Sequence, residues 1–314
     1  MKLSIHSVWI MSQITIRQSV RDKTVFLLSF LFLILVLVSA YLGWSATNTV
    51  NAIYLKTAVF LAANGLPVPS NPVLESSPLV LLRNMNTYVS LIGALAAIVL
   101  GYQMVAGDRK AGVLPLIGSR PIQTGQFALA KIVAVSFVLG AVLLIASLIN
   151  TLTFLLLPAF HLSAIEWQHL IAFYLASGLY MLFFGLLGML FSALAKNESI
   201  ALLVPVTLWL TLTFIFPQLT SSINPMASLN PLSATAAAPT SAFFHYSTLI
   251  LHPISMVEVY RTVSAQLLGF QPSTSSTHSL LEGFLQLGGG VLLLMGASIW
   301  SITRMDMSKG DYSE

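Results

Sequence analysis

The sequence contains no cysteine and few charged residues. Of its 314 residues, 8% are charged and 56% are apolar, whereas soluble domains average about 25% charged and about 45–50% apolar residues. The absence of cysteine excludes disulfide scaffolds, cysteine nucleophiles and thiolate metal sites. The mean hydropathy of +0.87 excludes a disordered chain, because disorder requires low hydrophobicity. So little charge cannot cover a soluble domain of this size, and the composition indicates an integral membrane protein.

Motifs for catalysis and nucleotide binding are also missing. The sequence has no G-x-x-x-x-G-K-[ST] phosphate loop, no G-x-S-x-G nucleophile elbow and no H-E-x-x-H zinc motif. The centres of its apolar runs carry no Asp, Glu, Lys or Arg, which are the groups that ion-coupled transporters use. We therefore predict no catalytic residue and no cofactor on this chain. The net charge of +4 does not indicate a nucleic-acid surface.

Six apolar runs are long enough to cross a bilayer. A spanning helix needs about 20 residues, because the hydrocarbon core is about 30 Å thick and each residue rises about 1.5 Å. The expected spans are residues 25–44, 87–106, 132–157, 170–191, 200–216 and 283–302. Gly93, Ala97 and Gly101 form a stripe of small residues that favours close packing of the second span within the bundle. The predicted fold class is an all-α integral membrane protein with six transmembrane helices.

Basic residues predict the orientation of these helices, since six spans leave both termini on one side. That side would carry Lys2, Arg17, Arg21, Lys23, Arg109, Lys110, Arg120, Lys131, Lys196, Arg304 and Lys309. The other side would carry only Lys56, Arg83 and Arg261. Because cytoplasmic loops are rich in Lys and Arg, we expect both termini in the cytoplasm. The chain is predicted to be a multi-pass protein of the inner (cytoplasmic) membrane.

The segments outside the spans complete a single membrane domain. Residues 1–24 predict an amphipathic N-terminal helix in the inner interface, with Trp9 on its apolar side and Arg17 and Arg21 near its end. A plain positive flank that sets topology would explain the same charges. The six-helix domain at 25–302 contains an inner loop at 107–131 and outer loops at 45–86 and 217–282, and a cytoplasmic tail follows at 303–314.

The second of these outer loops contains a further helix signal. Ser255 and Glu258 have the spacing of a capping box, and apolar residues repeat every three to four positions after them. We expect a short helix here, lying on the outer membrane face.

Five of the six histidines fall in expected outer loops, which raises the question of a metal site. Imidazole is a common ligand for copper and zinc. His161 and His169 share one loop and are the candidates for metal binding. The spacings are wide and no cysteine contributes, so solvated histidines at the interface explain the pattern better than a metal site does. A membrane-embedded enzyme or metal-handling protein acting at the outer face through histidines remains an alternative.

The inner loop carries the most specific pattern in the chain. Residues 107–131 read GDRKAGVLPLIGSRPIQTGQFALAK. This run resembles type-2 ABC transporter permeases, which show an acidic residue, basic residues, G-T-L, P-[VI] and a Lys. The matching positions are Asp108, Arg109, Lys110, Gly112, Leu114, Pro121, Ile122 and Lys131. Asp108 stands where Glu is usual, and Val113 stands where Thr is usual.

Three other stretches agree with this resemblance. The R-x-x-x-R-D-K run at 17–23 is similar to the start of that family, and FSALAKNESIA at 191–201 is similar to its second short inner turn. The stretch HPISMVEVYR at 252–261 is similar to N-P-x-D-x-[FY]-R in the permease of the nitrous-oxide-reductase maturation system.

The resemblance implies a membrane-spanning permease subunit of an ATP-driven ABC exporter. Such permeases form dimers, so a second permease copy or a homologous permease is an expected partner, along with membrane lipid. Each half would rest on a separate cytoplasmic ABC ATPase that holds ATP and Mg²⁺. The ATPase-coupling residues implied are Asp108, Arg109, Lys110, Gly112, Leu114, Pro121 and Lys131, together with Trp9, Arg17 and Arg21 of the N-terminal helix. An ATP-independent transporter is the remaining alternative.

Overall fold

The computed structural model describes residues 5–71, 73, 77–112, 114–118, 123–156, 162–219, 242–251, 254–269 and 280–305. All regular structure in these residues is helical, and they contain no strand. Six helical stretches are long and apolar enough to cross a membrane, namely Lys23–Ala63, Pro78–Lys110, Thr124–Leu156, Ala164–Leu194, Glu198–Ile215 and Leu280–Arg304. The predicted all-α fold with six spans is confirmed.

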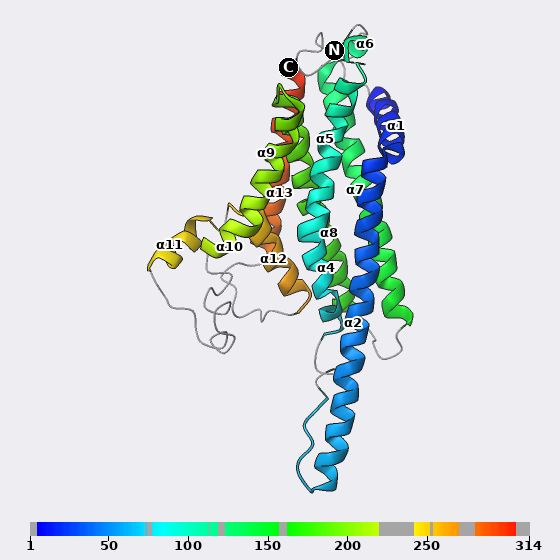
Figure 1. Ribbon diagram of the computed structural model, residues 1–314, viewed down its shortest axis with the longest axis vertical. Coiled ribbons are helices and arrows are strands. Elements are labelled where there is room, and N and C mark those ends of the chain that lie inside the picture. The colour runs from blue at the N-terminus through cyan, green and yellow to red at the C-terminus, as the bar shows by residue number, and fades with distance from the viewer. Residues whose placement is uncertain are drawn as a thin grey trace.

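Several of these stretches are built from more than one element (Figure 1). The chain begins with α1 (Ile5–Arg21) and α2 (Lys23–Ala63). The second stretch combines η1 (Pro78–Leu82), α4 (Arg83–Tyr88), the π-helical turn η2 (Val89–Gly93) and α5 (Ala94–Lys110). The middle of the chain forms α6 (Leu114–Gly118), α7 (Thr124–Leu156) and α8 (Ala164–Leu194). The remaining elements are α9 (Glu198–Leu210), the π-helical turn η3 (Thr211–Ile215), α10 (Phe216–Leu219), α11 (Ala242–Leu251), α12 (Met256–Leu267) and α13 (Leu280–Arg304).

Helices α5 and α8 cross at the centre of the bundle with their backbones in contact. A Cβ at Gly101 would overlap the carbonyl oxygen of Gly185, and a Cβ at Gly188 would overlap the carbonyl oxygen of Ile98. Only glycine permits such an approach, as in small-residue interfaces of membrane helices. The expected close packing of the second span within the bundle is therefore present.

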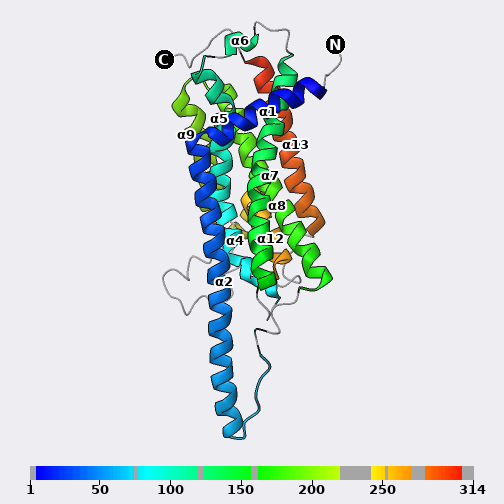
Figure 2. The ribbon, with the colours of Figure 1, turned by 90° about the vertical axis from the view of Figure 1, so that its right-hand side faces the viewer.

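Helix α1 lies across one end of the bundle and meets α2 at a sharp corner (Figure 2). Asp22 forms this corner, because its Oδ1 accepts hydrogen bonds from the backbone N–H groups of Thr24 at 2.8 Å and Val25 at 3.3 Å. A carboxylate in this position caps the start of α2 and is favoured by the helix dipole. The described ends of the chain, at α1 and α13, lie at the same end of the bundle as α6 (Figure 1).

The connection expected at residues 45–86 is shorter than predicted. Helix α2 does not end at Trp44 but continues to Ala63, and helical structure resumes at Pro78 instead of near residue 87. Residues 45–63 contain neither Gly nor Pro, so nothing in them breaks the helix. The helix ends at Asn64 and Gly65, and Gly65 has a φ of 68° that suits glycine.

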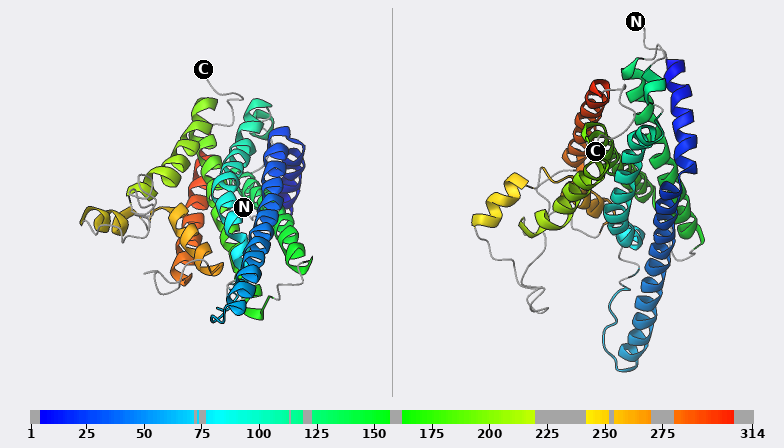
Figure 3. Two further views of the ribbon diagram at one scale, coloured as in Figure 1. Left: turned by 60° about the horizontal axis from the view of Figure 1, so that its bottom comes forward. Right: turned by 45° about the horizontal axis from the view of Figure 1, so that its top comes forward.

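The predicted short helix in the second outer region is present as α12. Ser255 caps it, with its side chain accepting a hydrogen bond from the backbone N–H of Glu258 at 3.3 Å. The helix does not lie on the bundle surface, because Val257, Tyr260 and Val263 are buried against neighbouring helices. Figure 3 shows α12 beside α13. Stacking of the Tyr260 ring on Tyr180, with ring centroids 4.3 Å apart, helps to hold α12 in this inner position.

Candidate functional site

The predicted coupling loop lies at the end of the bundle where the chain begins and ends (Figure 1). Helix α5 ends at Lys110, the short helix α6 projects beyond the bundle, and α7 begins at Thr124. Gly112 has a φ of 61°, which lets the chain turn between α5 and α6 without the strain that a side chain would cause. Of the predicted coupling residues, Pro121 lies outside the described residues, as does Arg120 of the same loop.

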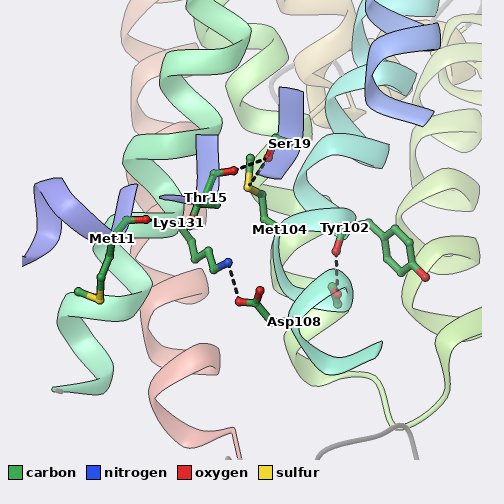
Figure 4. A network of polar contacts seen from close by, with 8 residues as sticks. Met11, Thr15, Ser19, Tyr102, Met104, Asp108 and Lys131 are labelled. Carbon is green, nitrogen blue, oxygen red and sulfur yellow. Dashed lines mark hydrogen bonds and ion pairs between the residues drawn. The ribbon is translucent and has the colours of Figure 1, made fainter. Parts of the chain in front are cut away.

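A buried ion pair joins the two ends of this loop. Lys131 at the start of α7 places its Nζ 2.6 Å from Oδ2 of Asp108 at the end of α5 (Figure 4). Their side chains are only 3% and 10% exposed, respectively. The Lys131 ammonium also lies 5.2 Å from the centre of the Phe127 ring, a favourable contact for a cation. The pair therefore fixes α5 to α7 at the point where the loop leaves the bundle.

Helix α1 covers this ion pair from the side. A cavity of about 140 Å³ separates them. Its polar lining includes Thr15, Gln18 and Ser19 of α1, Asp22 at the corner before α2, and the α5 amide Gln103. The Ser19 hydroxyl reaches Sδ of Met104 on α5 at 3.5 Å (Figure 4). The polar side of α1 thus faces the ion pair and the polar ends of α5 and α7.

The three residues predicted on α1 face the other way. Trp9 exposes 49% of its surface, and both Arg17 and Arg21 are exposed. They form an outward surface of α1 that carries one large aromatic ring and two positive charges.

Arg109 and Lys110 reach the neighbouring turn between α8 and α9. The Arg109 guanidinium donates hydrogen bonds to the carbonyl oxygens of Ala195 at 2.8 Å and Ala193 at 2.9 Å. These carbonyls lie at the C-terminal end of α8, where a cation is favoured by the helix dipole. Lys110 forms an ion pair with Glu198 at 2.5 Å. Both basic residues therefore have partners within their own chain.

A tyrosine completes this contact between the two turns. Tyr102 on α5 donates a hydrogen bond from its hydroxyl to Oε1 of Glu198 at 3.0 Å, and its backbone carbonyl accepts one from Ser192 at 3.1 Å. Sequence reasoning missed this set of contacts. The available signal was Glu198, the only carboxylate in the short SALAKNES turn, which complements the basic residues of the larger loop.

Helix α6 presents two leucines in opposite environments. Leu114 is fully buried against the bundle, whereas Leu116 exposes 67% of its surface at the tip of the loop, away from the bundle. The helix is thus anchored by one apolar side chain while another faces outward. An exposed apolar residue on a projecting element is a feature of protein interfaces.

The histidine candidates do not come together in the described part of the chain. His161 lies outside the described residues, and His169 is half-buried on α8. Among the described residues, no group of three or more His, Asp or Glu side chains is close enough to hold a metal ion.

A comparison with known protein families matches residues 9–307, from α1 to the end of α13, to the ABC-2 family transporter proteins. The chain belongs to the ABC-2 transporter family. Among curated protein sequences, none matches the chain. ABC-2 family members of this kind are permeases, the transmembrane components that act with ABC ATPase subunits. The resemblance read from the inner loop is thereby confirmed at the level of the family.

Proposed function

We propose that this ABC-2 protein is the permease subunit of an ATP-driven exporter, moving its substrate outward or across the bilayer. It works with a separate cytoplasmic ABC ATPase and pairs with a second permease copy or a homologous permease. The observation that carries the proposal is the projecting helix α6, with Leu116 outward and the base of its loop joined by the Asp108–Lys131 pair.

In this proposal, α6 docks in a groove of the ATPase through Leu116. ATP and Mg²⁺ are held by the ATPase, and their binding draws the two ATPase subunits together and displaces α6. The buried Leu114 and the Asp108–Lys131 pair pass this displacement to α5 and α7, because they hold the two ends of the loop to these helices. Arg109 extends the same movement to the end of α8 through its two hydrogen bonds.

This arrangement switches access to the substrate path without an ionisable residue inside the membrane. The six spans carry no charged residue near their centres, and charges there are the usual mark of ion-coupled transport. Movement of packed helices supplies the switch instead. The excess of Lys and Arg at the α6 end supports a cytoplasmic position for this end, in the inner membrane.

The docking role of α6 can be tested by co-purification in mild detergent with a co-expressed ABC ATPase. Leu116→Asp changes the exposed tip of the loop, and Leu66→Asp changes a leucine that is 52% exposed at the opposite end of the molecule. We expect the ATPase to accompany the wild type and Leu66→Asp but not Leu116→Asp, because a carboxylate would be desolvated in an apolar groove.

Two results would contradict parts of this proposal. Retention of the ATPase by Leu116→Asp would show that α6 is not the contact. Transport by the purified chain in the absence of any ATPase would contradict the exporter itself and favour an ATP-independent transporter.

A further inference from the structure

The second half of α2 extends far beyond the rest of the bundle (Figures 1 and 2). Helix α2 has 41 residues, which corresponds to about 60 Å at about 1.5 Å per residue. The hydrocarbon core is about 30 Å thick, so about 20 residues reach beyond it. We call residues 45–63 the α2 extension. Its only charged residue is Lys56.

The α2 extension exposes large apolar side chains. Ile53 is 60% exposed, Val59 is 71% exposed and Phe60 is 66% exposed. A helix that is apolar on most of its surface is normally buried, and contiguous exposed apolar surface marks an interaction site. Beyond the bilayer, this surface requires a protein partner.

The described part of the chain covers only one side of the α2 extension. After Gly65 the chain turns back along the helix, and the hydroxyl of Tyr54 donates a hydrogen bond to the carbonyl oxygen of Pro69 at 3.0 Å. The side-chain amide of Asn71 donates another to Oδ1 of Asn51 at 2.9 Å. The half-buried residues of the extension are Ser45, Thr47, Asn51, Tyr54, Ala58 and Leu61. The last four of these lie on the face covered by this return, and the other residues of the extension are exposed.

An apolar stripe runs along the exposed surface with the spacing of a coiled coil. Its members are separated by four, three, four and three residues, as are the a and d positions of a heptad repeat. They are Ala46, Val50, Ile53, Thr57 and Phe60. At about 100° per residue, this stripe is rotated about 100° from the face covered by the returning chain. Ile53, Thr57 and Phe60 are therefore open to a second helix. Ala46 and Val50, at the base of the stripe, are exposed but also line a cavity with residues 73–84 of the same chain.

We propose that this stripe pairs with the same stripe of a second copy of the chain, as a parallel two-stranded coiled coil outside the bilayer. The inference rests on the proposed pairing of two permeases, and it requires them to be identical. Two copies inserted in one membrane with the same orientation are parallel, so a two-fold axis along the bilayer normal brings identical stripes together.

The charge pattern agrees with this pairing. With Val50 at an a position, Lys56 falls at a g position. In a parallel pair, a g residue faces an e residue of the other helix, so the two Lys56 side chains do not oppose each other. Two heptads are short for an independent coiled coil, but anchoring both helices in one complex raises their effective concentration.

The absence of cysteine in the wild-type chain allows a direct test by disulfide formation. Ile53→Cys and Phe60→Cys each place one thiol in the stripe, and Leu55→Cys places one at an f position of similar exposure (54%). The full-length variants are oxidised mildly in membranes together with the ATPase. We expect disulfide-linked dimers from Ile53→Cys and Phe60→Cys, at a yield several-fold above that of Leu55→Cys. A disulfide requires Cα atoms within about 7 Å, a separation that the stripe meets and the f position does not.

Two outcomes would overturn the inference. Equal yields at all three positions would indicate random collision and not a defined pair. No linked dimer from any variant, in complexes whose mass contains two permease copies and two ATPases, would show that the extension does not pair. In that second case the proposed function would stand, because dimerisation and ATPase binding are measured independently of the disulfides.

Discussion

At the scale of single residues, the Asp108–Lys131 pair joins the two ends of the predicted coupling loop. Its two side chains are almost fully buried and lie on different helices. Removing one partner of a buried pair leaves an uncompensated charge, whereas replacing both is often close to neutral for stability. The neighbouring Lys110–Glu198 pair is about half exposed. Exposed pairs of this kind contribute only about 0–1 kcal/mol.

This difference predicts the stability of three variants. Lys131→Met should destabilise the protein by about 3–5 kcal/mol, because the Asp108 carboxylate stays buried without its partner. The double variant Asp108→Asn with Lys131→Met should recover most of that loss, and Lys110→Met should change little. Thermal unfolding in detergent, followed by size-exclusion chromatography, measures all three. A double variant as unstable as Lys131→Met alone would show that the buried charge is not the cause.

At the scale of elements, the α5–α8 crossing shows what could be predicted and what could not. The small-residue stripe of the second span indicated close packing, but its partners, Gly185 and Gly188 on α8, do not follow from one sequence. A single sequence shows which face of a helix carries small residues. Which other helix packs against that face depends on contacts between segments that are distant in the chain. The same limit applies to α12. The sequence predicted the helix from its capping residues, but it did not predict that the helix is buried.

Glycine-to-alanine substitutions at this crossing and elsewhere in the bundle should differ in their effect on stability. Gly101→Ala should destabilise the protein by about 1–3 kcal/mol or more, because the new methyl group meets the backbone of α8. Gly296→Ala on α13 has open space around its Cβ. It should be neutral or stabilising by up to about 1 kcal/mol, since alanine is the better helix former. The midpoint of thermal unfolding distinguishes the two, and equal effects would contradict the tight crossing.

At the scale of the whole molecule, the orientation predicted from charge concerns segments that the structure brings to one end. Helix α6, the start of α1 and the end of α13 lie together there (Figure 1). The α2 extension reaches out from the opposite end. The surface proposed to bind an ATPase and the surface proposed to bind a second copy thus lie at opposite ends of the molecule.

Single cysteines in the cysteine-free chain test this orientation. Leu116→Cys lies at the tip of α6, and Leu66→Cys lies just beyond the end of α2; both positions are exposed. In intact cells, a membrane-impermeant maleimide should label Leu66→Cys but not Leu116→Cys. In inverted vesicles the labelling should reverse, because cytoplasmic positions follow the excess of Lys and Arg. Labelling of Leu116→Cys in intact cells would place α6 outside and contradict its docking to an ATPase.

The sequence alone determined the number of spans, because the bilayer accepts only helices of about 20 apolar residues that satisfy their own backbone hydrogen bonds. The pattern of the loop at residues 107–131, which is local and continuous, also identified the family. Only the tertiary structure decided which partners Arg109, Lys110 and Lys131 have, since these contacts join segments that are distant in the chain. The continuation of α2 past Trp44, by contrast, has a local cause in the sequence. An apolar run marks where a helix enters the membrane, but the first Gly or Pro after Trp44 is Gly65, and the helix continues until that point.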